Sequence, residues 1–211
     1  MPCLECYINQ AQYLLADCKE VSDLKEVISN LKLPLTVGYA AEAYPINQKI
    51  LNAMFRNRLT HHGWEIKNVR IAPKELGLKI GLEGDFRRVL GNGLRIFGEV
   101  EFGHAGFIFR DFFKFSFIRD IDTYDLGILI VPSENFAKEV EGVSSFQSVR
   151  RILDHAKGSI QTPLAVFGID PDRDEDIDCL VLEPEWGRKE WRRQSSLVWD
   201  EFVAKHAGTL F

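Results

Sequence analysis

The sequence feature that most constrains the fold is a pair of alternating apolar and polar runs within residues 77–104, separated by the turn Gly91-Asn92-Gly93. An Asn-Gly pair between two such runs is among the better short-range signals for a tight β-hairpin. The turn also sets which residues of the two strands face each other. The sequence therefore predicts two antiparallel strands with a defined register at this point of the chain.

Pairing about this turn places Asp85 opposite Glu99 and Glu83 opposite Glu101. Because side chains alternate between the two faces of a sheet, the four carboxylates share one face and apolar side chains occupy the other. The apolar face consists of Ile80, Leu82, Phe86, Ile96, Val100 and Phe102. The hairpin thus predicts one core face and one carboxylate face.

The carboxylate face needs a positive partner, since like charges that face each other destabilise a sheet. At an effective dielectric constant near 20, two like charges about 4 Å apart repel by roughly 4 kcal/mol. Two interpretations stay open. Either Lys79, Arg87 and Arg95 neutralise a solvated face, or the carboxylate oxygens bind a hard divalent cation.

Composition limits the class of protein. Of the 211 residues, 45% are hydrophobic and 27% are charged, as in an ordinary soluble globular domain. No apolar run has the length of a membrane span and the first residues do not resemble a secretory leader, so we expect a cytoplasmic protein with no membrane partner. The net charge of −5 argues against a protein that coats nucleic acid without selectivity.

Three further patterns are weak candidates for a site. Cys3 and Cys6 form one Cys-x-x-Cys, but the chain lacks the second pair that a zinc ribbon needs. The acidic run 170–178 lacks the glycine and the glutamate that an EF-hand loop requires, which favours a solvated loop. His61 and His62 are adjacent and point in different directions, so they make a poor ligand pair.

The rest of the chain alternates between helical and strand patterns. Helices are expected twice within 7–32, from Pro45 to Gly63, at 105–119, after Ser133, at 145–157 and in the Trp-bearing C-terminal segment, and strands at 64–71, 126–131, 163–169 and 178–182. The runs 126–131 and 163–169 are apolar throughout, as in strands buried on both faces. This alternation predicts one α/β domain over residues 1–211, with a central mixed β-sheet flanked by helices.

The segment 105–119 is unusually aromatic, because it contains Phe107, Phe109, Phe112, Phe113, Phe115 and Phe117. We interpret it as a helix, which places Arg110 and Lys114 four residues apart on one face. Most of these phenylalanines are expected in the core. A role for some of them in a subunit interface stays open.

The order of acids on the hairpin, Asp85 followed by Glu99-Val100-Glu101, resembles the catalytic signature of the PD-(D/E)xK nuclease superfamily. The surrounding stretches Gly98–Gly103, Phe112–Phe115 and Asp125–Pro132 resemble type II restriction endonucleases of the BglII and BstYI kind. The resemblance covers roughly residues 45–170. One position differs from the superfamily pattern: Glu101 occupies the place of the usual lysine, as glutamate or glutamine does in the BamHI and BglII groups.

This resemblance implies a restriction-endonuclease-like fold and a Mg²⁺-dependent endonuclease that cuts double-stranded DNA at a specific short site. Asp85, Glu99 and the Val100 carbonyl would hold Mg²⁺, for which Mn²⁺ can substitute, and Glu101 would orient or deprotonate the attacking water. Cleavage of a palindrome implies a homodimer. We expect no nucleotide cofactor.

The resemblance also implies contacts with DNA outside the acids. Arg110 and Lys114 are candidates for backbone phosphates, and Arg150 and Arg151 for phosphates or bases, with a solvated surface role open for each. The candidates for a further polar group of the active site are Glu42, Asn47 and Glu65. The N-terminal helices within 1–44 and the C-terminal segment 183–211 are candidates for accessory roles in dimerisation or DNA recognition.

Other functions stay open at this level. One is a repair or structure-specific nuclease of the same superfamily, and another is a non-catalytic DNA-binding or regulatory module with the same fold. A third is a hydrolase that uses two carboxylates as acid and base without a metal, as glycosidases do.

Overall fold

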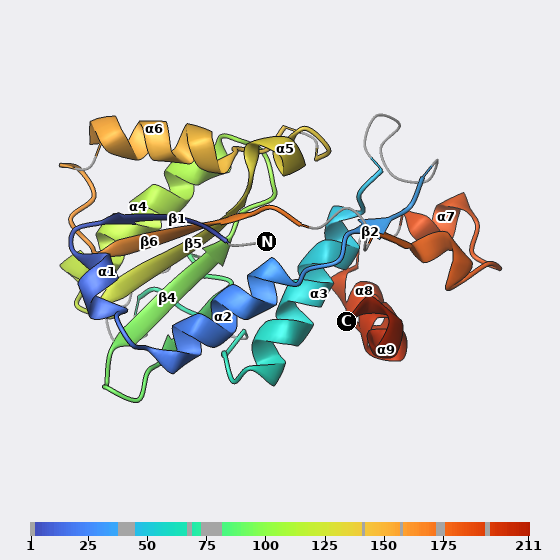
Figure 1. Ribbon diagram of the computed structural model, residues 1–211, viewed down its shortest axis with the longest axis horizontal. Coiled ribbons are helices and arrows are strands. Elements are labelled where there is room, and N and C mark those ends of the chain that lie inside the picture. Colours follow the sequence, from blue (N-terminus) through green and yellow to red (C-terminus); the bar gives the residue numbers. More distant parts are fainter. Residues whose placement is uncertain are drawn as a thin grey trace.

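The computed structural model describes residues 3–37, 45–66, 69–72, 82–140, 142–156, 158–171, 176–192 and 195–211. Within them a five-stranded mixed sheet has the order β1-β6-β5-β4-β3 (Figure 1). Its strands are β1 (Leu4–Ile8), β3 (Phe86–Val89), β4 (Arg95–Val100), β5 (Leu126–Pro132) and β6 (Leu164–Ile169), while β2 (Pro34–Leu35) and β7 (Ile177–Asp178) form a separate parallel pair. Strands β4, β5 and β6 are mutually parallel, and β1 and β3 are antiparallel at the two edges.

Helices cover both faces of this sheet, which confirms the predicted α/β class. They are α1 (Ala11–Leu14), α2 (Lys19–Ser29), α3 (Gln48–His61), α4 (Phe107–Asp120), α5 (Glu134–Ala137), α6 (Phe146–Ala156), α7 (Arg188–Trp191), α8 (Ser196–Lys205) and α9 (Ala207–Leu210). Figure 1 shows α2 and α3 on one side of the sheet and α6 on the other. In the described ranges, no helix has the length and apolar character needed to cross a membrane.

The core lies in two layers because β4, β5 and β6 are buried on both faces. Ile96, Ile128 and Ile130 face the layer formed with α2, α3 and α8, whereas Phe97 and Leu129 face the layer formed with α4 and α6. Every residue of β5 and β6 is buried. The continuous apolar runs therefore did indicate central strands, as predicted.

The hairpin has the predicted register. Phe86 pairs with Gly98, so Asp85 comes next to Glu99, and the turn closes through Gly93, whose φ of +85° favours glycine. The earlier part of the first run, residues 77–81 with Lys79 and Ile80, lies outside the described residues. The interpretation of a solvated carboxylate face holds only in part: Glu83 and Asp85 are exposed, whereas Glu99 and Glu101 are buried where α4 packs over the face.

Two glycines allow the aromatic rings of the hairpin to pack closely beside the acids. A Cβ at Gly98 would lie 2.1 Å from the ring of Phe86, and a Cβ at Gly84 would lie 2.1 Å from the ring of Phe97. Both distances are far inside van der Waals contact. The rings therefore fix the backbone directly before Asp85 and Glu99.

The N-terminal prediction was incomplete. Two helices do lie within 7–32, but residues 4–8 form β1, which pairs with β6. The alternation of Leu4, Cys6 and Ile8 spans only five residues and is stabilised by a partner about 160 residues away in the chain. Such a short edge strand carries little local signal.

Two later strand predictions were also too long. In place of a strand at 64–71, isolated bridges pair Glu65 with Arg87 and Arg70 with Glu83, and residues 67–68 lie outside the described residues. In place of a strand at 178–182, β7 ends at Asp178 and a 3₁₀ turn follows at Cys179–Val181. The predicted C-terminal helix is divided into α7, α8 and α9.

The helix predicted at 105–119 is confirmed as α4, but only half of its six phenylalanines pack in the core, where Phe117 is partly buried beside two buried rings. Phe112 and Phe115 are buried, whereas Phe107, Phe109 and Phe113 are 46%, 60% and 55% exposed. The exposed rings therefore point away from the sheet that the buried ones cover. Helical periodicity allows only one side of α4 to face the core.

Candidate active site

Four carboxyl groups gather where β3 begins and β4 ends, beneath α4. Glu99 lies in β4, Glu101 follows its end, Asp85 precedes β3, and Asp111 comes from α4. Glu99, Glu101 and Asp111 are 3%, 5% and 1% exposed. Buried acids at this density need hydrogen bonds and positive charge to be stable.

The backbone of β4 orients Asp85. The Val100 N–H donates to Asp85 Oδ2 at 2.8 Å, and the Asp85 N–H donates to the Gly98 carbonyl at 3.0 Å. Because the N–H and C=O of one strand residue point to the same side, the Val100 carbonyl also faces the side on which Asp85 lies. Asp85 and Val100 line a pocket of about 130 Å³.

A buried lysine lies between Glu99 and Asp111. The Nζ of Lys114 is 2.7 Å from Glu99 Oε1 and 3.1 Å from Asp111 Oδ1. Lys114 is only 4% exposed, so this ammonium faces the acids and not the solvent. Asp111 and Lys114 lie three residues apart and present both groups from the same face of α4.

Glu101 is held by the turn that follows it and by an arginine. The Gly103 N–H donates to Glu101 Oε1 at 2.5 Å, and Arg110 Nη2 lies 3.4 Å from Glu101 Oε2. The Arg110 guanidinium also stacks over the Phe107 ring, 4.6 Å from its centre. Arg110 therefore lies at the rim of the acid cluster, with its side chain about half exposed.

The acids lie in pairs, and the pKa values of Asp85, Glu99 and Glu101 are raised. Asp85 shares a hydrogen bond with Glu99, and Glu101 shares one with Asp111. Burial raises the pKa of Glu99, to which the charge of Asp85 adds, and burial with the nearby Asp111 raises the pKa of Glu101 to about 7. Burial also raises the pKa of Asp85, although the Val100 N–H opposes this.

Lys114 stays positively charged in this environment. Burial alone would lower its pKa, but Glu99 and Asp111 outweigh burial and raise it. Lys114 and Arg110 together do not balance four carboxyl groups, so the cluster is short of positive charge, which adds to burial in raising the pKa values of Glu99 and Glu101.

This shortage fits a divalent cation. Within the described part of the chain, no three His, Cys, Asp or Glu side chains are grouped so that they could hold a metal ion. Mg²⁺, however, commonly binds through only one or two carboxylates, with water and substrate phosphate as further ligands. Asp85 and Glu99, with the Val100 carbonyl, are a donor set of that kind.

Among the described residues, the other candidates make contacts outside this cluster. Asn47 caps α3 by accepting from the Lys49 and Ile50 N–H groups, which is a structural role. Glu65 is exposed and forms a 2.7 Å ion pair with Arg87. Glu42 lies outside the described residues, and Arg150 and Arg151 are exposed on α6.

Sequence reasoning missed Asp111 and the position of Lys114. The signal was present as an acid and a lysine three residues apart in an aromatic helix. It could be interpreted only once the packing of α4 over the hairpin was known, because that packing decides which face of the helix is buried.

Comparison with known proteins identifies the family. The family model described as "Restriction endonuclease BglII/BglIII" matches residues 6–169. Among solved structures, restriction endonuclease BglII complexed with a DNA 16-mer has a TM-score of 0.59 at 16% identity, covering 82% of this chain and 79% of that one. Free BglII has a TM-score of 0.51 at 15% identity, covering 82% and 81%.

At such low identity the structural likeness shows a common fold, and no curated protein sequence matches the chain. The family model, in contrast, spans most of the chain and includes the whole acid cluster. The protein therefore belongs to the BglII family of restriction endonucleases.

Proposed function

We propose that this protein is a Mg²⁺-dependent type II restriction endonuclease that hydrolyses phosphodiester bonds of double-stranded DNA at a specific short site. The main support is the pairing of Asp85 with Glu99 at the end of β4, in a chain of the BglII family. The structural relative crystallised with a DNA 16-mer supports duplex DNA as the substrate. As a restriction enzyme it would act in the cytoplasm.

Asp85, Glu99 and the Val100 carbonyl would hold the metal ion. When bound, Mg²⁺ supplies Lewis-acid chemistry, by which it polarises the scissile phosphate, activates water and stabilises the leaving oxygen. The protein keeps the two carboxylates in place with the Val100 N–H on Asp85 and Lys114 on Glu99. Mn²⁺ is expected to substitute, since it accepts the same oxygen donors.

We assign Glu101 the role of orienting or deprotonating the attacking water. Its pKa of about 7 lets the carboxylate accept a proton near neutral pH, which suits a general base. Asp111 shares a hydrogen bond with Glu101 and can stabilise the protonated form. The Gly103 N–H donates to Oε1 of the same carboxylate and holds it in place.

The basic residues divide into two groups. Lys114 is buried against Glu99, so we assign it to the acid cluster and not to a DNA phosphate. Arg110 at the rim of the cluster, together with Arg150 and Arg151 on α6, remains available to contact backbone phosphates. These contacts would position the duplex without reading its bases.

A homodimer would place one active site on each DNA strand. The outer side of α4 presents Phe109 and Phe113, and the ring of Phe113 stacks on that of Phe117 with centres 5.9 Å apart. An exposed aromatic stripe of this kind is typical of a protein interface. We therefore assign this face of α4 to contact with a second copy of the chain.

A digest of plasmid DNA tests the function directly. With Mg²⁺, wild-type protein should give discrete and reproducible fragments, whose ends define the site, and EDTA should abolish cleavage. Cleavage confined to branched or damaged DNA would favour a repair nuclease. Absence of cleavage together with absence of Mg²⁺ or Mn²⁺ binding would favour a non-catalytic module.

A further inference from the structure

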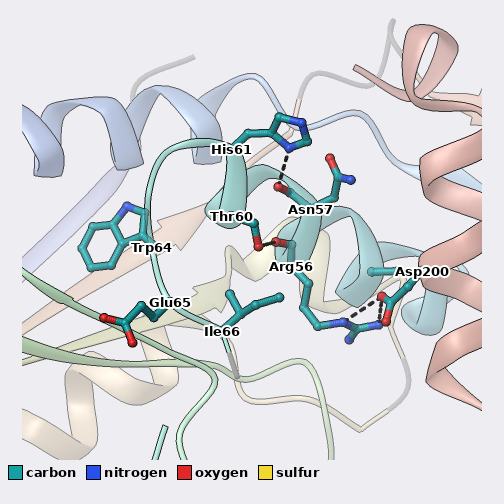
Figure 2. A pocket seen from close by; sticks show the side chains of 9 residues that line it. Arg56, Asn57, Thr60, His61, Trp64, Glu65, Ile66 and Asp200 are labelled. Carbon is teal, nitrogen blue, oxygen red and sulfur yellow. Dashed lines mark hydrogen bonds and ion pairs between the residues drawn. The ribbon is translucent and has the colours of Figure 1, made fainter. Parts of the chain in front are cut away.

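A groove leads away from the candidate active site along α3. The pocket that contains Asp85 and Val100 is also lined by Arg56 and Ile66. A second pocket, of about 490 Å³, is lined by the same Arg56 and Ile66 (Figure 2). The two spaces therefore adjoin, and together they connect the acid cluster with the side of α3 that faces α8.

One side of α3 provides the polar wall of this groove. Asn52, Arg56 and Thr60 recur at intervals of four residues, and Asn57 and His61 lie beside them. The Thr60 hydroxyl donates to the Arg56 carbonyl at 2.8 Å, and His61 Nδ1 is 2.9 Å from the Asn57 carbonyl. Among the described residues, the side-chain amide of Asn57 has no hydrogen-bond partner.

Arg56 is held in the groove by a carboxylate of α8. Its Nε and Nη2 both approach Asp200 Oδ1, at 2.9 and 2.5 Å, as Figure 2 shows. The side chains of Arg56 and Asp200 are 30% and 44% exposed. A partly exposed ion pair contributes little stability, so another anion can replace Asp200 at small cost.

The lining fits a sugar-phosphate backbone. Arginine binds phosphate oxygens through parallel N–H groups, while amide and hydroxyl groups add weaker contacts to phosphate and sugar. Ile66 gives an apolar surface for deoxyribose. The second carboxylate of the groove, Glu65, is already neutralised by Arg87 at 2.7 Å.

We propose that this α3 groove binds the backbone of the cleaved DNA strand beside the scissile phosphate, and that Arg56 exchanges Asp200 for a phosphate when DNA binds. The proposal rests on the function proposed above and adds a binding site to it. A strand whose phosphate lies at Asp85 must continue past the acid cluster, and the adjoining pocket offers a path whose α3 wall carries hydrogen-bond donors.

The test measures the affinity for duplex DNA across a range of salt concentrations, with Ca²⁺ in place of Mg²⁺ so that the DNA stays intact. Arg56→Gln should weaken binding by roughly tenfold and lower the slope of log K against log salt by about one, the amount expected for one lost phosphate contact. Lys19→Gln is the matched control, because Lys19 is exposed at the start of α2, which contacts the hairpin turn at the far end from Asp85. It should leave the slope unchanged.

Asp200→Asn should act in the opposite direction. It frees Arg56 from its competing carboxylate, so DNA should bind more tightly in this variant, and the gain should vanish in the Arg56→Gln/Asp200→Asn double variant. A merely structural ion pair would give the same loss of thermal stability in both single variants and no gain in DNA affinity, which would overturn the proposal.

These experiments distinguish a wrong groove assignment from a wrong proposed function. If wild-type protein binds DNA and cuts it with Mg²⁺, but Arg56→Gln keeps the wild-type salt slope, the groove assignment is wrong and the proposed function stands. If wild-type protein neither binds nor cuts DNA, the proposed function is wrong and the groove assignment falls with it.

Discussion

Lys114 Nζ lies 2.7 Å from Glu99 Oε1, in a site where both side chains are almost completely buried. The position that is lysine in most of the superfamily is Glu101 here, yet an amine still reaches Glu99 from a different element, α4. The positive charge that the hairpin acids need is thus supplied by tertiary packing. This relationship links the stability of the fold with the arrangement of the candidate active-site acids.

Lys114→Met should destabilise the metal-free protein, because it leaves Glu99 and Asp111 without their ammonium. Breaking a buried ion pair from one side typically costs about 3–5 kcal/mol. Urea unfolding at pH 5 and at pH 8 measures the loss. In the Lys114→Met/Glu99→Gln double variant, part of the stability should return.

A loss below about 1 kcal/mol at both pH values, as for an exposed ion pair, would contradict this account of Lys114.

Glu101 should make stability depend on pH. Its pKa in the folded protein is about 7, above the ordinary 4.5, so the folded state binds this proton more tightly than the unfolded state. This contribution is fully present below pH 4.5 and is lost as the pH rises through 7. Since one pKa unit corresponds to about 1.4 kcal/mol, the change is about 3 kcal/mol.

Urea unfolding of wild-type protein and Glu101→Gln in EDTA at pH 5, 6 and 7 checks this. Wild-type stability should fall relative to the variant across that range. If the free energies of unfolding of the two proteins change in parallel with pH, the pKa of Glu101 is not raised by folding.

The local parts of the fold could be predicted from the sequence. The register of the hairpin follows from the Asn-Gly turn and from alternation, and α3 follows from apolar spacing with Asn47 as a side-chain cap. The pairing of Asp85 with Glu99 was predicted for the same reason: it depends on a turn only a few residues away.

The parts that depend on distant packing could not be predicted. Which face of α4 is buried decides that Lys114 joins Glu99 while Phe113 is exposed, and the α4 sequence is aromatic on both sides. The groove beside α3 depends on Asp200, which reaches Arg56 across 144 residues of chain. Neither contact leaves a periodic pattern in the sequence.

Gly98→Ala should destabilise the protein and impair cleavage together. The added Cβ would lie 2.1 Å from the Phe86 ring, and overpacking of this kind typically costs about 1–3 kcal/mol. Movement of Phe86 or of β4 would displace Glu99, the next residue. Urea unfolding and cleavage rate are the measurements.

Gly91→Ala is the matched control, because its Cβ would meet only Glu20 Oε1, at 3.7 Å. If the two alanine variants behave alike, close ring packing at Gly98 is not what positions Glu99.

Phe113→Glu should convert a dimer into a monomer. The Phe113 side chain is 55% exposed on the outer face of α4, and a charge there would be buried without a partner in the proposed interface. Sedimentation velocity should show the change in mass. Leu197→Glu, at a residue 63% exposed on α8, should leave the dimer intact.

A wild-type protein that sediments as a monomer with and without DNA would contradict the assignment of this face of α4.

The most direct test of the central claim is the rate of DNA cleavage by Asp85→Asn, with Glu83→Gln as control. Both changes remove one negative charge from the same segment, but only Asp85 accepts a hydrogen bond from the Val100 N–H beside Glu99, whereas the backbone of Glu83 forms a β-bridge with Arg70. If Asp85 and Glu99 hold the metal ion, the cleavage rate of Asp85→Asn should be at least about 100-fold lower than that of the wild type, while the variant still folds and binds DNA. Glu83→Gln should cut at the wild-type rate, and equal cleavage by both variants would contradict the account.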